Sequence, residues 1–264
     1  HQVIDNFGAS DAWRCDFIGK YWPEEKREQI ADLLFKREFD EQGNPIGMAL
    51  TTWRVNIGAG SYENREAKEV NNSWNRTECF LSADGKYDFT KQAGQRWFMK
   101  AAKERGMNNF LFFTNSAPYF MTRSGATVSM DRNYINLRED KFDDFARFLV
   151  QCAKHFRNEG YGVNYISPLN EPNVEWHTNF FQEGTFATKA DIYKMVNELD
   201  KAIEEEQNQI YDKVLGSWIN ESETVRLEFS YDEEQGEKQF EVYEYHAHAW
   251  SQIYIANVGW LTFD

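Results

Sequence analysis

Short apolar runs alternate with longer segments in which apolar residues recur at helical spacing, up to about residue 206. The short runs predict strands at residues 6–10, 48–57, 109–114 and 163–167. The longer segments predict one helix that begins at Pro23 and three more at residues 91–105, 140–158 and 188–206. Strands that alternate with helices of this length are typical of a parallel α/β fold.

Local signals support several of these elements. The helix at Pro23 has acidic residues in its first turn, followed by Ile30, Leu33 and Leu34 at helical spacing. The run at residues 109–114 (NFLFFT) is almost entirely apolar, which is the pattern of a parallel strand buried on both faces.

Long loops follow two of the predicted strands, at residues 58–89 and 115–138. Functional loops at the carboxyl ends of strands are typical of a (β/α)8 barrel. A doubly wound sheet is the alternative, but the chain has neither a G-x-G-x-x-G turn nor a Walker loop. We therefore predict a TIM-type barrel, with residues 1–264 forming a single domain.

The pattern changes after residue 206. Residues 213–219 predict a fifth strand, and residues 226–231 and 240–250 alternate apolar and polar positions around a charged turn at 232–238. This second pattern indicates an antiparallel hairpin, so three strand–helix units of an eightfold barrel are missing from the sequence pattern. Either the barrel is incomplete in this chain, or residues 207–264 are organised in an unusual way.

Composition narrows the classes of partner. The net charge is −14, which disfavours nucleic acid, an anionic membrane surface and polyanionic substrates. Aromatic residues make up 16% of the chain, and flat aromatic faces suit both a large core and the C–H faces of sugars. No apolar run is long enough to span a membrane. A neutral substrate and a monomeric protein fit best.

The three cysteines, Cys15, Cys79 and Cys152, are too few for a disulfide framework and form no C-x-x-C pair. The chain begins at His1, which a removed export signal or a trimmed chain would explain. We expect a secreted, periplasmic or cell-surface protein without a cofactor.

The sharpest chemical signal is the stretch ISPLNEP at residues 166–172. It places Glu171 just beyond an apolar strand, at the rim where barrel enzymes carry their catalysts. Glycoside hydrolysis needs such a carboxylic acid to protonate the departing oxygen, and Asn170 could hydrogen-bond a sugar 2-hydroxyl. Pro172 would fix the turn after the acid. The alternative is an ordinary loop carboxylate followed by a turn.

Further stretches share their order along the chain with one enzyme family: residues 5–13 (DNFGASDAW), 53–61 (WRVNIGAGS), 92–97 (QAGQRW), 114–121 (TNSAPYFM), 166–172 (ISPLNEP) and 182–185 (QEGT). Over about residues 2–206 the chain resembles glycoside hydrolase family 30, which includes glucosylceramidases, xylanases and endo-β-1,6-galactanases. The galactanase-like branch is the most similar. The resemblance implies a retaining, metal-independent (β/α)8 barrel with an attached β-sandwich.

The resemblance also implies roles for single residues. Glu171 would be the acid/base, and Arg54 would lie near the nucleophile and keep it ionised. The other residues expected to bind substrate are Asp11, Trp53, Asn115, Tyr119, Asn170, Trp176 and His246. For Trp53 and Arg54 the alternative is a core tryptophan beside a structural ion pair.

The chain departs from the family at the second carboxylate. A retaining enzyme needs a nucleophile roughly 5–5.5 Å from the acid/base. In residues 260–264 (WLTFD) the family's pattern would place a Glu where Phe263 stands. Other acids lack a convincing context, namely Glu221, Glu223, Glu241, Glu244 and Asp264.

Three functions stay open at this point. The first is a retaining hydrolase of a neutral β-linked glycan, with β-1,6-galactan as the first choice by resemblance. The second is a truncated or catalytically incomplete relative that binds carbohydrate without turnover. The third is a metal hydrolase built on His246 and His248, whose spacing places both on one face of a strand, although no further ligands are apparent.

Overall fold

The computed structural model describes residues 4–64, 70–129, 131, 133–174, 176, 181–218, 251–255 and 259–263. Its sheet contains four strands: β1 (Gly8–Asp11), β2 (Thr52–Asn56), β3 (Phe110–Phe113) and β4 (Val163–Ser167). These strands run parallel and lie in the order β1-β2-β3-β4. The predicted α/β class is therefore confirmed.

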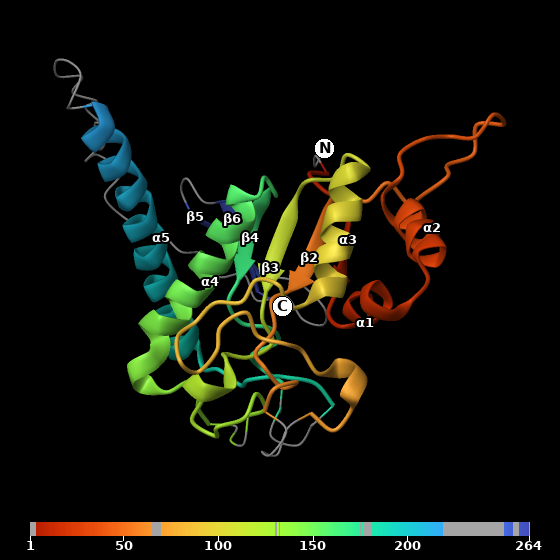
Figure 1. Ribbon diagram of the computed structural model, residues 1–264. Helices are drawn as coiled ribbons and strands as arrows, with labels where there is room; N and C mark the ends of the chain where they lie inside the picture. Colours follow the sequence, from red (N-terminus) through yellow and green to blue (C-terminus); the bar gives the residue numbers. More distant parts are fainter. Residues whose placement is uncertain are drawn as a thin grey trace.

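The helices follow the strands in the chain. The α-helices are α1 (Arg14–Tyr21), α2 (Glu24–Phe35), α3 (Ala93–Glu104), α4 (Phe142–Asn158) and α5 (Lys189–Trp218). Three short 3-10 helices lie in the connections: η1 (Ser73–Asn75), η2 (Tyr119–Met121) and η3 (Glu139–Lys141). The long loops gather beyond the carboxyl ends of the strands, below the sheet in Figure 1.

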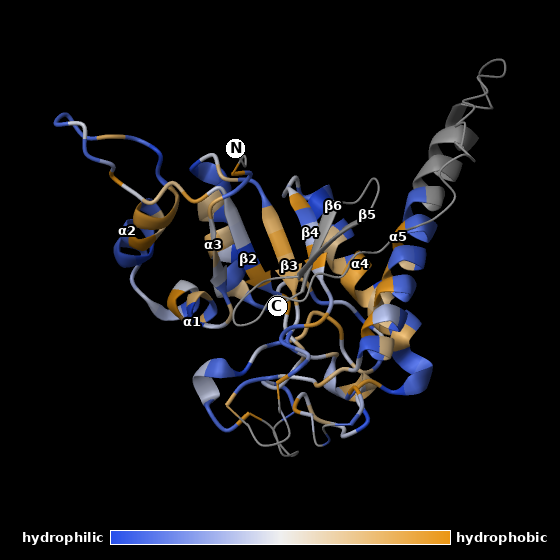
Figure 2. Ribbon diagram, turned by 180° about the vertical axis from the view of Figure 1, so that it is seen from behind, coloured by the Kyte–Doolittle hydropathy of each residue, from blue (hydrophilic) through white to orange (hydrophobic). Residues whose placement is uncertain are grey.

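The core forms where β3 meets the helices. All four residues of β3 are buried, as expected for a central parallel strand covered on both faces. Helix α4 supplies most of the facing aromatic side chains, because its apolar residues recur on one stripe: Phe142, Phe145, Phe148, Leu149, Cys152 and Phe156. Figure 2 shows this apolar centre, with the more hydrophilic α5 at the edge of the fold.

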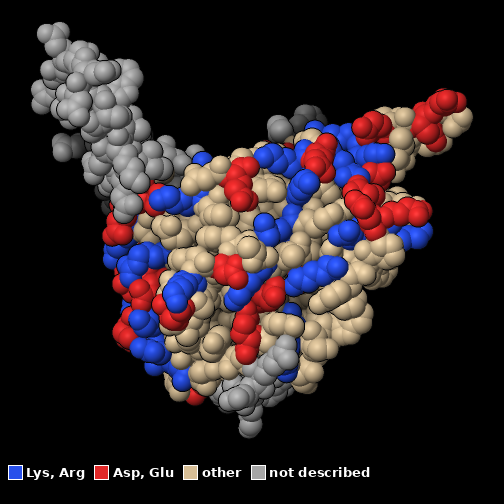
Figure 3. Space-filling view, in the orientation of Figure 1, with Lys and Arg blue, Asp and Glu red and all other residues tan. Residues whose placement is uncertain are grey.

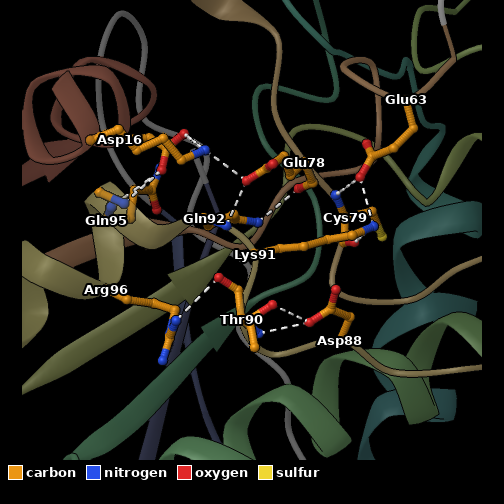
Figure 4. Close-up of polar contacts among 12 residues, drawn as sticks. Asp16, Glu63, Glu78, Cys79, Asp88, Thr90, Lys91, Gln92, Gln95 and Arg96 are labelled. Atoms are coloured by element: carbon orange, nitrogen blue, oxygen red, sulfur yellow. Dashed lines mark hydrogen bonds and ion pairs between the residues drawn. The ribbon is translucent and has the colours of Figure 1, made fainter.

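Helices α1 and α3 pack closely, and α1 was missed by the sequence pattern. A side chain on Gly19 would come within 2.4 Å of the Gly94 carbonyl oxygen, so the two backbones touch only because both residues are glycines. Asp16 Oδ1 accepts a hydrogen bond of 3.0 Å from Gly94 N at the start of α3 (Figure 4). A carboxylate at this position satisfies a free N–H group and complements the helix dipole.

The end of β2 is tied to the start of α3 by Gln92 (Figure 4). Its side-chain nitrogen donates to the carbonyl oxygens of Ile57 (2.7 Å) and Glu78 (2.8 Å), and its backbone N donates to Glu78 Oε2 at 2.7 Å. Gln92 is buried and has a left-handed φ of 49°. Lys20 of α1 joins this network through a 2.7 Å ion pair with Glu78. The network therefore holds the loop after β2 in place.

The prediction of a fifth strand at residues 213–219 was wrong, because α5 continues to Trp218. Residues 207–213 contain no Gly or Pro that would stop the helix, and a short apolar run does not distinguish a strand from a helix.

The hairpin predicted at residues 226–250 lies outside the described residues. The described antiparallel pair comes later, as β5 (Ser251–Ile255) and β6 (Gly259–Phe263), and β6 lies next to β4. Antiparallel structure near the C-terminus is therefore confirmed, at a different position. In the part of the chain that the structure describes, no helix is long and apolar enough to cross a membrane.

Candidate active site

Trp53 and Arg54, which the sequence analysis grouped as substrate-binding residues, lie on opposite faces of β2. Trp53 is buried, and its ring meets the ring of Phe35 on α2 edge-on, with centroids 5.2 Å apart. Side chains alternate along a strand, so Arg54 points to the opposite face. The structure therefore puts Trp53 in the core under α2 and does not bring it to the other candidate residues.

Arg54 connects the carboxyl ends of the sheet. Its guanidinium donates from Nη1 to Ser10 Oγ at 3.1 Å and from Nη2 to Asn170 Oδ1 at 2.5 Å. The guanidinium carbon lies 3.4 Å from the centre of the Phe113 ring. These partners come from β1, from β3 and from the segment after β4, so one buried cation ties the ends of all four strands together.

Asp11 is the last residue of β1, and one of its two carboxyl oxygens accepts a hydrogen bond. Its Oδ1 accepts a hydrogen bond of 3.1 Å from Cys15 N, whereas Oδ2 is buried and has no partner among the described residues. Burial raises the pKa of Asp11 to about 7, although the Cys15 N–H group opposes the shift. A buried carboxyl oxygen without a partner is suited to a hydroxyl group from a ligand.

Glu171 lies in the turn after β4 with a left-handed φ of 43°. Its carbonyl oxygen accepts hydrogen bonds from Val174 N (3.1 Å) and from Trp176 Nε1 (3.0 Å). The Glu171 side chain itself is partly exposed. A strained backbone held by two donors at a strand end is common at functional sites.

Trp176 is buried, with 2% of its surface exposed. A side chain on Gly184 would come within 2.3 Å of its ring, so the indole fills the space beside that backbone. The sequence placed Trp176 on the wall of a sugar cleft. In the described part of the chain it is buried and its indole nitrogen donates to the Glu171 carbonyl oxygen.

Two candidates follow β3. Asn115 is 1% exposed, and its Nδ2 has no hydrogen-bond partner among the described residues. Tyr119 opens η2, is half-buried and donates its backbone N–H to the Ala59 carbonyl oxygen at 3.0 Å. Both follow the carboxyl end of β3 in the chain. Asn115 therefore offers a buried donor just beyond the carboxyl end of β3, at the same end of the parallel sheet as the Asp11 acceptor.

Glu183 was not among the candidate residues, although it lies in the QEGT stretch. It is fully buried, and its carboxylate accepts hydrogen bonds from Ala59 N (3.2 Å), Ser61 N (3.0 Å) and Thr77 Oγ1 (2.6 Å). It therefore joins the loop after β2 to the loop after β4. The signal in the sequence was a charged residue directly before Gly184. Such a residue does not by itself distinguish a structural acid from a catalytic one.

The remaining candidates lie outside the described residues. This applies to His246, His248, Glu221, Glu223, Glu241, Glu244 and Asp264. Within the described ranges, no group of three His, Cys, Asp or Glu side chains is arranged to hold a metal ion. Phe263 lies in β6, the strand next to β4.

The chain is similar to several known proteins in sequence and in structure. A solved structure of a conserved exported protein from Bacteroides fragilis is 81% identical with a TM-score of 0.77, and the match covers 78% of this chain and 42% of that one. An endo-β-1,6-galactanase from Hypocrea rufa is 22% identical over 248 residues, covering 84% of this chain and 50% of that enzyme.

A shorter match joins the chain to an exo-β-1,6-galactobiohydrolase from Bifidobacterium longum, at 28% identity over 156 residues, which is 55% of this chain and 10% of that enzyme. The chain therefore spans half or less of the length of these curated relatives. The family model described as O-Glycosyl hydrolase family 30 matches residues 1–262. Because this model covers nearly the whole chain, the chain belongs to O-glycosyl hydrolase family 30.

Proposed function

We propose that this chain acts in the hydrolysis of a neutral β-linked glycan, with Glu171 as the general acid/base. The observation that carries the proposal is the position of Glu171 and Asn170 directly beyond β4, with Asn170 held by the buried Arg54. β-1,6-Galactan is the preferred substrate, because both curated relatives are named for action on β-1,6-linked galactose polymers.

In the proposed reaction, the Glu171 carboxyl group gives its proton to the glycosidic oxygen as the bond to the anomeric carbon breaks. A second carboxylate attacks the anomeric carbon and forms a glycosyl–enzyme ester. Glu171, now ionised, removes a proton from water, and the resulting hydroxide displaces the carboxylate. This second carboxylate would come from outside the described residues, and Arg54 would help to keep it ionised.

Sugar hydroxyl groups would bind the polar atoms that the fold leaves without partners among the described residues. Asp11 Oδ2 can accept a hydrogen bond, and Asn115 Nδ2 can donate one. Asn170 would contact the 2-hydroxyl through its amide nitrogen, because its Oδ1 already accepts from Arg54. These three residues give the site both donors and acceptors, as a sugar requires.

Surface charge supports a neutral substrate. The chain carries a net charge of −14, which repels anionic polymers. On the face shown in Figure 3, acidic and basic side chains are interspersed among uncharged ones, without an extended basic area among the residues described there. Action outside the cytoplasm is part of the same proposal, since the 81% identical structure is that of an exported protein.

The test compares the wild-type chain with Glu171→Gln on two kinds of substrate. Cleavage of β-1,6-galactan needs protonation of a poor leaving group, so it should fall by at least about 100-fold in the variant. Cleavage of a 4-nitrophenyl β-galactoside needs little protonation, so its first bond-breaking step should be much less affected. Glu159→Gln, on the surface at the end of α4, is the control. Measurable cleavage of galactan at the same rate by wild type and Glu171→Gln would reject the role of Glu171.

A second candidate function is carbohydrate binding without turnover. It is favoured by Phe263, which stands where the family resemblance predicts a nucleophilic Glu. In that case neither wild type nor Glu171→Gln would cleave galactan, but both would bind galactan oligosaccharides in calorimetry. Absence of both binding and cleavage would exclude the two functions together.

A further inference from the structure

Three aromatic side chains form a cluster on the outer side of α1. The Phe17 ring lies 4.2 Å from the Trp74 ring and 4.9 Å from the Tyr21 ring, measured between centroids. Tyr21 is 68% exposed and Trp74 is 50% exposed. Trp74 belongs to η1 in the loop after β2, so two distant segments build one apolar surface, which we call the α1–η1 platform.

The three side chains of the platform lie outside the hydrophobic core. Helix α1 contacts the core through Cys15 and Ile18, and its close approach to α3 is at Gly19. Phe17 and Tyr21 are on another face of the same helix, and neither they nor Trp74 belong to the hydrophobic core cluster. Contiguous exposed apolar patches mark interaction sites on protein surfaces, and aromatic side chains are enriched there.

The platform is continuous with the rim of the candidate active site. Helix α1 begins three residues after Asp11. Next to Trp74, Asn75 is buried and donates from Nδ2 to the Phe181 carbonyl oxygen at 3.0 Å. The Phe181 ring then meets the Trp13 ring edge-on, with centroids 6.1 Å apart. These contacts therefore join the platform to the segment that follows Asp11 and to the segment that precedes Glu183.

We propose that the α1–η1 platform is a second carbohydrate-binding site, which holds a neutral β-linked polysaccharide outside the residues assigned to bond cleavage. The faces of aromatic rings are electron-rich and attract the weakly positive C–H groups of a pyranose face. Arg14 lies with its guanidinium carbon 5.4 Å from the Trp74 ring centre and is exposed, so it can donate hydrogen bonds to sugar hydroxyls beside the rings.

A polysaccharide fits this surface better than a second protein chain does. The platform consists of three side chains edged by the charged, exposed Arg14, whereas a stable protein interface needs roughly 800 Å² of buried surface, or about 20–30 residues, on each partner. Its position at the rim would let one long glycan occupy both sites, and two linked contacts on one polymer increase the overall affinity. The identity of the polymer as a galactan rests on the proposed function.

The experiment measures binding of soluble β-1,6-galactan and of the β-1,6-linked galactose disaccharide in the Glu171→Gln background, so that the polymer stays intact. In Tyr21→Ala/Trp74→Ala, the ratio of polymer affinity to disaccharide affinity should fall about tenfold, which corresponds to about 1.4 kcal/mol. Trp74→Phe should keep most of the polymer affinity, because a ring remains. Tyr193→Ala is the matched control, since Tyr193 is 65% exposed on the distant helix α5.

Unchanged polymer affinity in the double variant, with an unchanged melting temperature, would overturn the proposal. So would a change from dimer to monomer in sedimentation, because it would assign the platform to a second copy of the chain. Failure of the proposed function gives a different result. The wild-type chain would then bind galactan through the platform without cleaving it, and the double variant would still lose that binding.

Discussion

Arg54 and Asn170 are 116 residues apart in the chain, and Arg54 Nη2 donates a 2.5 Å hydrogen bond to Asn170 Oδ1 in the buried space at the carboxyl ends of the strands. The bond orients the amide of Asn170, so that its nitrogen is free to face a ligand. It also places a permanent positive charge beside the residue that precedes Glu171. The two residues thus link the stability of the sheet to the geometry of the candidate site.

Replacing Arg54 with Lys should destabilise the fold and weaken sugar binding. Lys keeps the charge, but it cannot contact Ser10 and Asn170 together or stack on the Phe113 ring. The expected loss is about 2–3 kcal/mol in the free energy of unfolding, measured by urea denaturation. A double-mutant cycle with Asn170→Ala should give a coupling energy of about 1–2 kcal/mol. Additive effects would show that the hydrogen bond contributes nothing.

Asp11→Asn should remove a pH dependence of stability. The raised pKa of Asp11, about 7, means that the folded protein binds this proton more tightly than the unfolded chain does. This contribution to wild-type stability is complete below pH 4 and is lost as pH rises towards 7, by up to about 1.4 kcal/mol per pH unit. The unfolding free energy of Asp11→Asn should change less with pH over this range, as measured by urea denaturation at several pH values.

Asp84→Asn offers a contrast of opposite sign. Asp84 is exposed, and hydrogen bonds from Lys86 and Ser82 lower its pKa. Any contribution that Asp84 makes is present above pH 4 and is lost as pH falls, so Asp84→Asn should leave the pH dependence of the unfolding free energy between pH 4 and 7 unchanged.

For the Asp11 prediction, the contradicting outcome is the same slope of unfolding free energy against pH in wild type and Asp11→Asn. It would show that Asp11 is charged in the folded protein.

Glu171→Gly should stabilise the protein while it removes the proposed acid/base. The left-handed φ of 43° is strained for Glu but natural for Gly, so the unfolding free energy should rise by about 0.5–1 kcal/mol. Ala49→Gly is the control, because Ala49 has a φ of 53° away from the site. It should gain a similar amount and leave galactan binding and cleavage unchanged. A less stable Glu171→Gly protein would contradict the assignment of backbone strain.

Trp176→Phe tests whether the indole positions the Glu171 turn. The variant keeps an aromatic ring but loses the donor to the Glu171 carbonyl oxygen, so stability should fall by about 1 kcal/mol. Gly184→Ala should cost more, about 1–3 kcal/mol, because the new methyl group overlaps the indole. Both variants should lower galactan cleavage through kcat, since the turn loses its orientation. Wild-type kcat in Trp176→Phe would remove this role.

Glu183→Gln should be strongly destabilising although the side chain keeps its shape. The carboxylate accepts from Ala59 N, Ser61 N and Thr77 Oγ1, and an amide NH₂ group would face one of these donors. A loss of about 2–4 kcal/mol is expected in thermal or urea unfolding. The reverse result, near-normal stability with lost cleavage, would indicate a chemical role for Glu183.

Some of the site was predictable from the sequence because it depends on local pattern. The apolar run at residues 163–167 predicted the whole of β4, and the position of Glu171 beyond it follows from the register of the chain alone. The parallel order of the strands follows from their alternation with helices. The family relationship also follows from the sequence, since the family model matches residues 1–262.

Long-range packing decided the rest. Four residues of β2 are buried, so alternation shows that Trp53 and Arg54 face opposite sides but not which side meets the helices. Only the position of Phe35 places Trp53 in the core. The pairing of Arg54 with Asn170 likewise requires β2 and the end of β4 to meet in space.

Helix α1 has only eight residues, and its close contact with α3 depends on the pairing of Gly19 with Gly94, which no local pattern reveals. Residues 213–218 show the same limit, because a short apolar run takes its conformation from the helix that precedes it. The sequence by itself determined the four parallel strands, the main helices that follow them up to about residue 206, and the position of the acid at a strand end. Tertiary structure decided which side chains share the site, because each face of a buried strand is assigned by what packs against it.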